Sequence, residues 1–155
     1  MSDDAHPDEI TLGRIETEVA LLMRLGEATR RGTGTMEHRL LDRAAYVILR
    51  HLDVAGPQNV SALAARLNLD GSTVTRQVSA LQRDGLIART PDPADGRGTV
   101  ISATAAGLQR MAAVRAARTR LYGEMLSGWS TADRDTLANL LHRLNEALDA
   151  RNRRR

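Results

Sequence analysis

The sequence predicts a mainly α-helical chain that carries one small β-hairpin. Apolar residues recur every three or four positions along most of the 155 residues, as on the buried face of a helix. Between residues 86 and 102 the pattern changes to two short extended runs with a turn-rich loop between them. Aromatic residues make up only 2% of the chain, so Leu, Val, Ile, Met and Ala must fill its core. This composition favours closely packed helices.

Two helices are expected before residue 56. The first covers residues 9–31, where apolar residues keep helical spacing until the Gly-Thr-rich segment at 31–35. The second covers residues 38–53 and ends before Gly56 and Pro57, because glycine suits a helix C-terminus and proline prevents continuation. Its predicted buried stripe consists of Leu41, Ala45, Ile48, Leu49 and Leu52.

Two short helices follow in immediate succession. Asn59 can cap the first and Asp70 the second, since both side chains accept hydrogen bonds from helix N-termini. Between them lie only Asn68 and Leu69, and asparagine tolerates the left-handed backbone of a tight turn. We therefore predict a helix-turn-helix that ends at Gly85. Its apolar stripes are Leu63, Ala64 and Leu67 on the first helix and Val74, Val78 and Leu81 on the second.

The extended runs at 86–90 and 99–102 predict a hairpin, or wing, behind the helix-turn-helix. The loop between them, residues 91–98, contains two prolines and two glycines. Thr104 can cap a long helix that ends near Gly128. The Ser130–Asp133 segment resembles a capping box and opens a last helix with Leu137, Leu140, Leu141, Leu144 and Leu148 as its apolar residues.

Composition excludes several chemistries. All 22 basic residues are arginine, so a Schiff-base lysine and a P-loop lysine are both absent. The chain has no cysteine, which removes thiol nucleophiles and thiolate metal sites. No apolar stretch reaches the about 20 residues of a membrane span, and the acidic N-terminus is unlike a signal peptide. We expect a cytoplasmic protein with no membrane partner.

The polar face of the second short helix is the main candidate for function. If its apolar stripe is buried, six polar residues turn outward or sideways: Ser72, Thr73, Thr75, Arg76, Gln77 and Ser79. Short hydroxyl side chains near a helix N-terminus allow the backbone to approach DNA closely, and Arg and Gln reach base edges or phosphates. A solvated polar face has the same pattern, so the wing is needed to favour the DNA interpretation. Arg89, on the first predicted wing strand, is a further phosphate candidate.

Residues 61–107 resemble the MarR (multiple antibiotic resistance regulator) family of bacterial winged helix-turn-helix transcription factors. The resemblance depends on four segments: SALAARL at 61–67, STVTR at 72–76, LQRDGLI at 81–87 and, above all, DPADGR at 92–97, followed by Val100 and TAAG at 104–107. It implies that Arg97 enters the minor groove and that Asp95 orients Arg97 through a charge-assisted hydrogen bond. It also implies a small aromatic or anionic effector, for which Tyr46, His51 and Arg110 are candidate contacts. For Tyr46 the sequence favours packing between helices over a ligand contact.

The resemblance also implies a homodimer in which the first helix and the last two intertwine. Two further observations agree. Residues 60–98 carry five arginines against four aspartates, so one unit alone neutralises few phosphates. The apolar stripes of the terminal helices also need a partner. Two recognition helices would then meet major grooves about 34 to 36 Å apart on a pseudo-palindrome.

The predicted organisation is an acidic disordered tail at 1–8, a helical dimerisation region at 9–35 and 104–150, a winged helix-turn-helix at 36–103 and a basic tail at 151–155. We expect a repressor that a small molecule releases from its operator. Without cysteine, the thiol-oxidation route to release that the family offers is excluded. Whether the tail and Arg110, Arg115, Arg118 and Arg120 reach DNA stays open.

Other site types are weakly supported. His6, His38, His51 and His142 lack metal-ligand spacing, and Gly32-Thr33-Gly34 lacks the strand that precedes a nucleotide-binding loop. We expect no cofactor, no metal and no catalytic residue. The competing class is a helical interaction module in which the DNA-binding motif is incidental. A small hydrolase is a third class, for which the chain has no motif.

Overall fold

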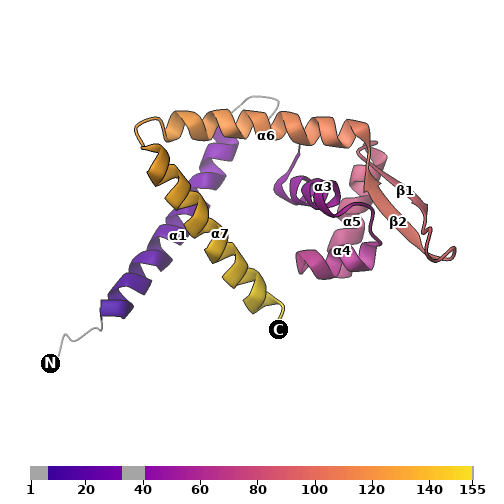
Figure 1. Ribbon diagram of the computed structural model, residues 1–155, viewed down its shortest axis with the longest axis horizontal. Helices are drawn as coiled ribbons and strands as arrows, with labels where there is room; N and C mark the ends of the chain where they lie inside the picture. Colours follow the sequence, from indigo (N-terminus) through magenta and orange to yellow (C-terminus); the bar gives the residue numbers. More distant parts are fainter. Residues whose placement is uncertain (1–6, 33–40, 155) are drawn as a thin grey trace. The chain divides into compact units, whose positions relative to one another are not determined.

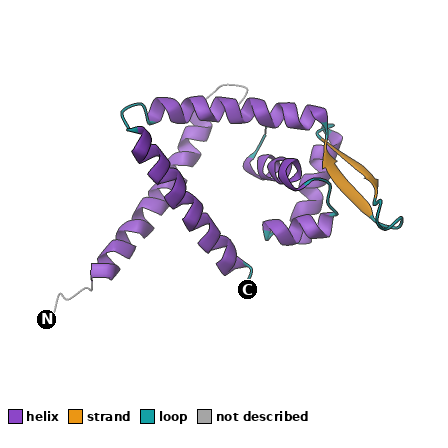
Figure 2. Cartoon of the chain, viewed as in Figure 1, coloured by secondary structure: helices purple, strands orange, loops and turns teal. Residues whose placement is uncertain are grey.

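The computed structural model describes residues 7–32 and 41–154, which contain six helices and one two-stranded sheet (Figures 1 and 2). The chain divides into two compact units, residues 1–39 and residues 40–155. Helix α1 (Pro7–Gly32) is the described part of the first unit. It starts two residues before the expected position, so Pro7 and Asp8 of the predicted tail are helical; the remainder of that tail lies outside the described residues.

Proline is well suited to the first position of α1, because it has no N–H that needs a partner, and Asp8 and Glu9 in the first turn favour the positive end of the helix dipole. The large apolar side chains of α1 are exposed within this chain. They are Ile10, Leu12, Ile15, Leu21, Leu22, Met23 and Leu25, of which Met23 is 68% exposed.

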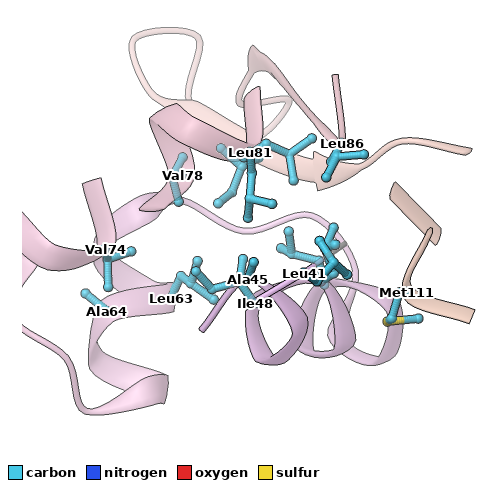
Figure 3. Packing of buried hydrophobic residues seen from close by; sticks show 14 of the residues in the cluster. Leu41, Ala45, Ile48, Leu63, Ala64, Val74, Val78, Leu81, Leu86 and Met111 are labelled. Atoms are coloured by element: carbon cyan, nitrogen blue, oxygen red, sulfur yellow. The ribbon is translucent and has the colours of Figure 1, made fainter. Parts of the chain in front are cut away.

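The second unit, residues 40–155, has one hydrophobic core. The helix α3 (Arg43–Ala55) contributes to it, together with three other helices and the two strands that are described below. Figure 3 shows side chains from these elements converging on α3. The predicted stripe of α3 is buried, with Ile48 and Leu49 fully inaccessible. The expected start at His38 lies outside the described residues. Within them, Asp42 caps the helix by accepting a hydrogen bond from the Ala45 backbone N–H at 2.7 Å.

Helices α4 (Val60–Leu67) and α5 (Gly71–Arg83) form the predicted helix-turn-helix. Asn59 and Asp70 cap them as expected, accepting from the backbone N–H of Ala62 and Thr73. Asn68 adopts the left-handed conformation (φ 50°, ψ 44°) that the short turn requires. Leu63 and Ala64 of α4 are buried, and the third predicted residue, Leu67, packs partly buried against the same core.

The wing consists of β1 (Ile87–Pro91) and β2 (Thr99–Ala103), which pair antiparallel with Arg89 opposite Ile101. The predicted strand at 86–90 is therefore shifted by one residue. Leu86 precedes the strand because Gly85, at φ 71°, ends α5, and the Leu86 N–H bonds back to the Leu81 carbonyl at 2.9 Å. An isolated bridge between Gln58 and Ile101, which the sequence did not indicate, adds the α3–α4 connection to the sheet edge.

Helix α6 (Ala105–Met125) is fastened to the base of the wing at its first turn. Thr104 caps it, accepting from the Gly107 N–H at 3.0 Å, and its hydroxyl donates to the Gly85 carbonyl at 2.7 Å. The Thr104 N–H donates to the Leu86 carbonyl at 3.0 Å. A Cβ at Gly107 would lie 2.1 Å from that same oxygen, so only glycine allows this approach of helix and strand.

The last helix, α7 (Thr131–Asn152), has no buried residue within the chain. Its predicted cap is present: Ser130 Oγ accepts from the Asp133 N–H, but the Asp133 carboxylate accepts from Ser130 Oγ at 2.6 Å in place of a backbone N–H. Helix α6 ends at Met125, three residues before Gly128. The Leu126 carbonyl accepts from the Trp129 N–H at 3.0 Å and from the Arg134 guanidinium at 2.7 Å. Arg151 and Asn152 of the predicted basic tail belong to α7.

Replacing Gly107 with alanine is expected to destabilise the fold by about 3 kcal/mol, because the added methyl group overlaps the Leu86 carbonyl oxygen. Urea denaturation at one fixed protein concentration measures the effect. Gly123→Ala on the same helix is the matched control. Among the described residues, a Cβ at Gly123 would have no heavy atom within 4 Å apart from its chain neighbours and the backbone of its own helix, so the substitution should stabilise by about 0.5 to 1 kcal/mol. Equal effects at the two positions would contradict the close approach.

Candidate nucleic-acid interface

Helix α5 presents one polar side to solvent because its other side is locked in the core. Val74 and Val78 are fully inaccessible and Leu81 is 3% exposed, as the sequence predicted. Of the six predicted contact residues, Ser72, Thr75, Arg76 and Ser79 are exposed, and Thr73 and Gln77 are half-buried. A face that combines hydroxyl, amide and guanidinium groups offers donors and acceptors to base edges and donors to phosphates.

The N-terminus of α5 is organised by Asp70. Its carboxylate accepts hydrogen bonds from Ser72 Oγ at 2.5 Å, from Thr73 Oγ1 at 2.5 Å and from the Thr73 N–H at 2.8 Å. These bonds, led by the Ser72 hydroxyl and followed by the Thr73 hydroxyl, hold the pKa of the Asp70 carboxyl well below its usual range. Because both hydroxyl protons are donated to Asp70, Ser72 and Thr73 offer their lone pairs outward, and these suit base amino groups.

The tip of the wing is closed by short-range hydrogen bonds. The Asp92 N–H donates to the Gly98 carbonyl at 2.9 Å, and the Gly98 N–H donates to the Asp95 carbonyl at 2.8 Å. The Ala94 N–H donates to the Asp92 carboxylate at 2.9 Å. The loop therefore holds a defined shape, and it presents Arg97 as an exposed side chain at its end.

The predicted hydrogen bond between Asp95 and the Arg97 guanidinium is not formed. The Asp95 carboxylate accepts instead from the Arg97 backbone N–H, at 3.1 Å. A carboxylate reaches the N–H two residues ahead through a local turn, so it needs no ordering of the long arginine side chain. Asp95 thus shapes the backbone beneath Arg97. In residues 7–32 and 41–154, no hydrogen bond or ion pair occupies the Arg97 guanidinium.

Arg89 lies on β1 and makes a contact with α5 that the sequence did not reveal. Its Nε donates to the Gln82 Oε1 at 2.7 Å. Arg83 was also missed. It follows Arg76 by seven positions, which returns to the same side of a helix, and it is exposed. That spacing was readable in the sequence, whereas the Gln82 contact depends on how the wing folds back beside α5.

The three candidate effector contacts do not form one cluster through hydrogen bonds or ring contacts in the described part of the chain. Tyr46 is half-buried against the core, and the Arg118 guanidinium carbon lies 4.8 Å from its ring centroid. His51 Nε2 lies 3.0 Å from Gln58 Oε1. Arg110 is half-buried on α6. The packing role foreseen for Tyr46 is thus present, and a ligand role for the three residues stays a prediction.

Across the described ranges, no group of three or more His, Cys, Asp or Glu side chains is placed to hold a metal ion. Among the helices of those same ranges, none is both long and apolar enough to cross a membrane.

Comparisons with known proteins identify relatives along nearly the whole chain. Residues 41–99 match the model of the MarR family. YxaD of Bacillus subtilis (strain 168), an uncharacterized HTH-type transcriptional regulator, is 36% identical over 142 residues, which cover 92% of this chain and 95% of YxaD. The HTH-type transcriptional repressor IacR of Pseudomonas putida is 29% identical over 72% of this chain and 69% of its own.

A solved structure shares the fold. The organohalide-sensing transcriptional regulator RdhR-CbdbA1625, in its 2,4-dichlorophenol-bound form, superposes with a TM-score of 0.67. The alignment covers 96% of this chain and 90% of that one, at 19% sequence identity.

Substituting Asp70 tests the organisation of the α5 N-terminus. Asp70→Ala should lower the thermal midpoint by about 2 to 6 °C, because Ser72 and Thr73 lose their acceptor, whereas Asp70→Asn keeps a capping oxygen and most of the stability. The folded-state pKa of Asp70 is lowered, so its contribution is complete above the unfolded-state pKa of about 3.9 and is lost as pH falls below it. Thermal scans from pH 7 to pH 3 should show the wild type approaching Asp70→Asn. A constant difference would contradict this.

Proposed function

The chain belongs to the MarR family of helix-turn-helix transcriptional regulators, and it is not an enzyme. From that premise we propose that it is a homodimeric repressor, which binds a pseudo-palindromic operator and leaves it when a small molecule binds. One observation carries the proposal: α5 and the wing share one core, which leaves the polar face of α5 outward and Arg97 exposed at the wing tip. As a regulator of bacterial transcription, the protein would act in the cytoplasm.

DNA recognition is divided between two grooves in this proposal. In the major groove, base edges and nearby phosphates are contacted by six residues of α5: Ser72, Thr73, Thr75, Arg76, Gln77 and Ser79. Arg97 enters the adjacent minor groove, where a guanidinium is attracted by the negative potential of a narrow groove. Asp95 supports Arg97 by holding the backbone beneath it, and Arg89 contacts a phosphate.

Dimerisation is supported by the apolar surface that the chain leaves exposed. On α7, Leu140 is 53% and Leu148 is 49% exposed, and Trp129 just before that helix is 47% exposed. Burying such side chains in a second copy gains about 1.5 to 3 kcal/mol for each large residue. We propose that the terminal regions 9–35 and 104–150 build this interface, and that two winged units thereby reach one duplex.

The repressor and effector parts of the proposal are supported by relatives. IacR is named a repressor, and RdhR-CbdbA1625 was solved with 2,4-dichlorophenol, a small aromatic phenol. In this chain, Tyr46, His51 and Arg110 are the proposed contacts for a small aromatic or anionic effector. A ligand that binds more tightly to the DNA-incompetent arrangement would shift the population away from the operator.

Selection of bound duplexes from a random pool tests the function directly, and it is expected to return a pseudo-palindrome with half-sites about 10 base pairs apart. Arg97→Ala should weaken binding to that duplex about 5- to 100-fold without unfolding the protein, because a groove contact is lost. Arg143→Ala, which removes an exposed arginine from α7, is the control and should change affinity little. Anisotropy titrations measure both. If no duplex is enriched from the pool and the wild-type protein is monomeric at low salt, the results would favour the helical interaction module.

Leu140→Glu should convert the dimer to a monomer, since a carboxylate would be buried without a partner in the proposed interface. Sedimentation equilibrium measures the mass. Asn139→Glu changes the neighbouring exposed position of the same helix and should leave the dimer intact. A monomeric wild type would remove the homodimer from the proposal.

A further inference from the structure

The structure places Arg89 at the junction between the recognition helix and the wing. Arg89 lies opposite Ile101 in the antiparallel ladder, and directly opposed side chains project from the same face of a sheet. Ile101 is fully buried in the core, so Arg89 extends toward the side of the sheet that α5 covers. Near the end of α5, its side chain reaches the Gln82 amide and stays exposed.

Adjacent major and minor grooves of a duplex are separated by one sugar-phosphate strand. If α5 enters a major groove and the wing tip enters the next minor groove, that strand must pass beneath the junction of the two elements. Arg89 is a cation at this junction. Its Nε is held by Gln82, and the four N–H groups on its two Nη atoms have no hydrogen-bond or ion-pair partner in the described ranges. Two Nη donors are what a bidentate phosphate contact uses.

We propose that Gln82 is a positioning residue, which orients the Arg89 guanidinium toward the phosphate strand between the two grooves. The inference rests on the proposed DNA-binding function, and it gives a role to a residue of the LQRDGLI segment for which the resemblance implied none. Gln82 acts through Arg89 and touches no DNA itself. A neutral amide suits the role, because a carboxylate at the same place would hold the guanidinium and also cancel its charge.

Gln82 raises the affinity for DNA in this proposal because it orders the Arg89 side chain before DNA binds. A free arginine loses rotamer freedom on binding, which costs a few-fold in affinity for each immobilised side chain. With Nε already bonded at 2.7 Å, part of that loss occurs on folding. Gln82→Met keeps the length of the side chain and removes the acceptor. We expect it to weaken binding about three- to tenfold per protomer.

The experiment is a double-mutant cycle on the duplex selected with the wild type, with affinities measured by anisotropy across a range of salt concentrations. Gln82→Met should weaken binding in the wild type and have no effect in Arg89→Ala, because its partner is already absent. Arg89→Ala should reduce the slope of log K against log salt by about two for a dimer. Arg89→Ala with Gln82 intact is the matched control, so that each comparison in the cycle differs at position 82 alone.

A purely structural role for Gln82 makes a different prediction for Gln82→Glu. An ion pair to Arg89 would preserve the α5–β1 contact, so a structural role predicts wild-type binding. Positioning for phosphate predicts that Gln82→Glu binds more weakly than Gln82→Met, with a smaller salt slope, at an unchanged thermal midpoint. Two results would overturn the inference and leave the proposed function intact. One is that wild type and Gln82→Met bind the duplex with equal affinity; the other is that Gln82→Met lowers the affinity equally with and without Arg89. A wild type that retains no duplex would overturn both.

Discussion

The burial of one apolar stripe of α5 determines which side chains this helix exposes to solvent. Val74, Val78 and Leu81 enter a core that α3, α4, the wing and α6 also build, and each such side chain stabilises by about 1.5 to 3 kcal/mol. Because those three residues face inward, Arg76 and its polar neighbours must face outward. The helix is short and has no other buried side, so its orientation depends entirely on this contact.

A second constraint connects the wing to the same core. The Leu86 carbonyl accepts from the Thr104 N–H, and Gly107 packs against that oxygen more closely than any side chain allows. The Thr104 hydroxyl reaches the Gly85 carbonyl, so the end of α5, the start of β1 and the start of α6 meet within a few residues. Hydrogen bonds therefore connect the base of the wing to the end of α5 and to the start of α6. Its tip, by contrast, is shaped by local hydrogen bonds and leaves a long cation exposed.

The polar surface that results is finely balanced in charge. Asp70 stays ionised at the start of α5, and its carboxylate accepts hydrogen bonds from the hydroxyl groups of the exposed Ser72 and the half-buried Thr73. Arginines at positions 76, 83, 89 and 97 supply the positive charge. Residues 60–98 carry only one more arginine than aspartates, so in the proposed function one unit alone would neutralise few phosphates. A second copy, which would cover the exposed apolar surface, would double these phosphate contacts.

The sequence by itself determined the order of the helices, the helix-turn-helix, the wing and the buried stripe of α5. These features follow from caps and periodicities that act over three or four residues: Asn59, Asp70, Thr104 and Ser130 all cap the helices that they were expected to cap. The MarR-type motif likewise pointed to the family that the relatives establish.

Only the tertiary structure decided which of several reachable partners each polar side chain takes. Asp95 is the exception: it bonds to the backbone N–H two residues ahead in place of the guanidinium, because this local turn needs less ordering. Arg89 meets Gln82, and Arg118 lies over Tyr46, through contacts between separate elements whose approach depends on the packed core. Spacing along the chain carries no record of such choices, since they arise from the three-dimensional distances that the core imposes.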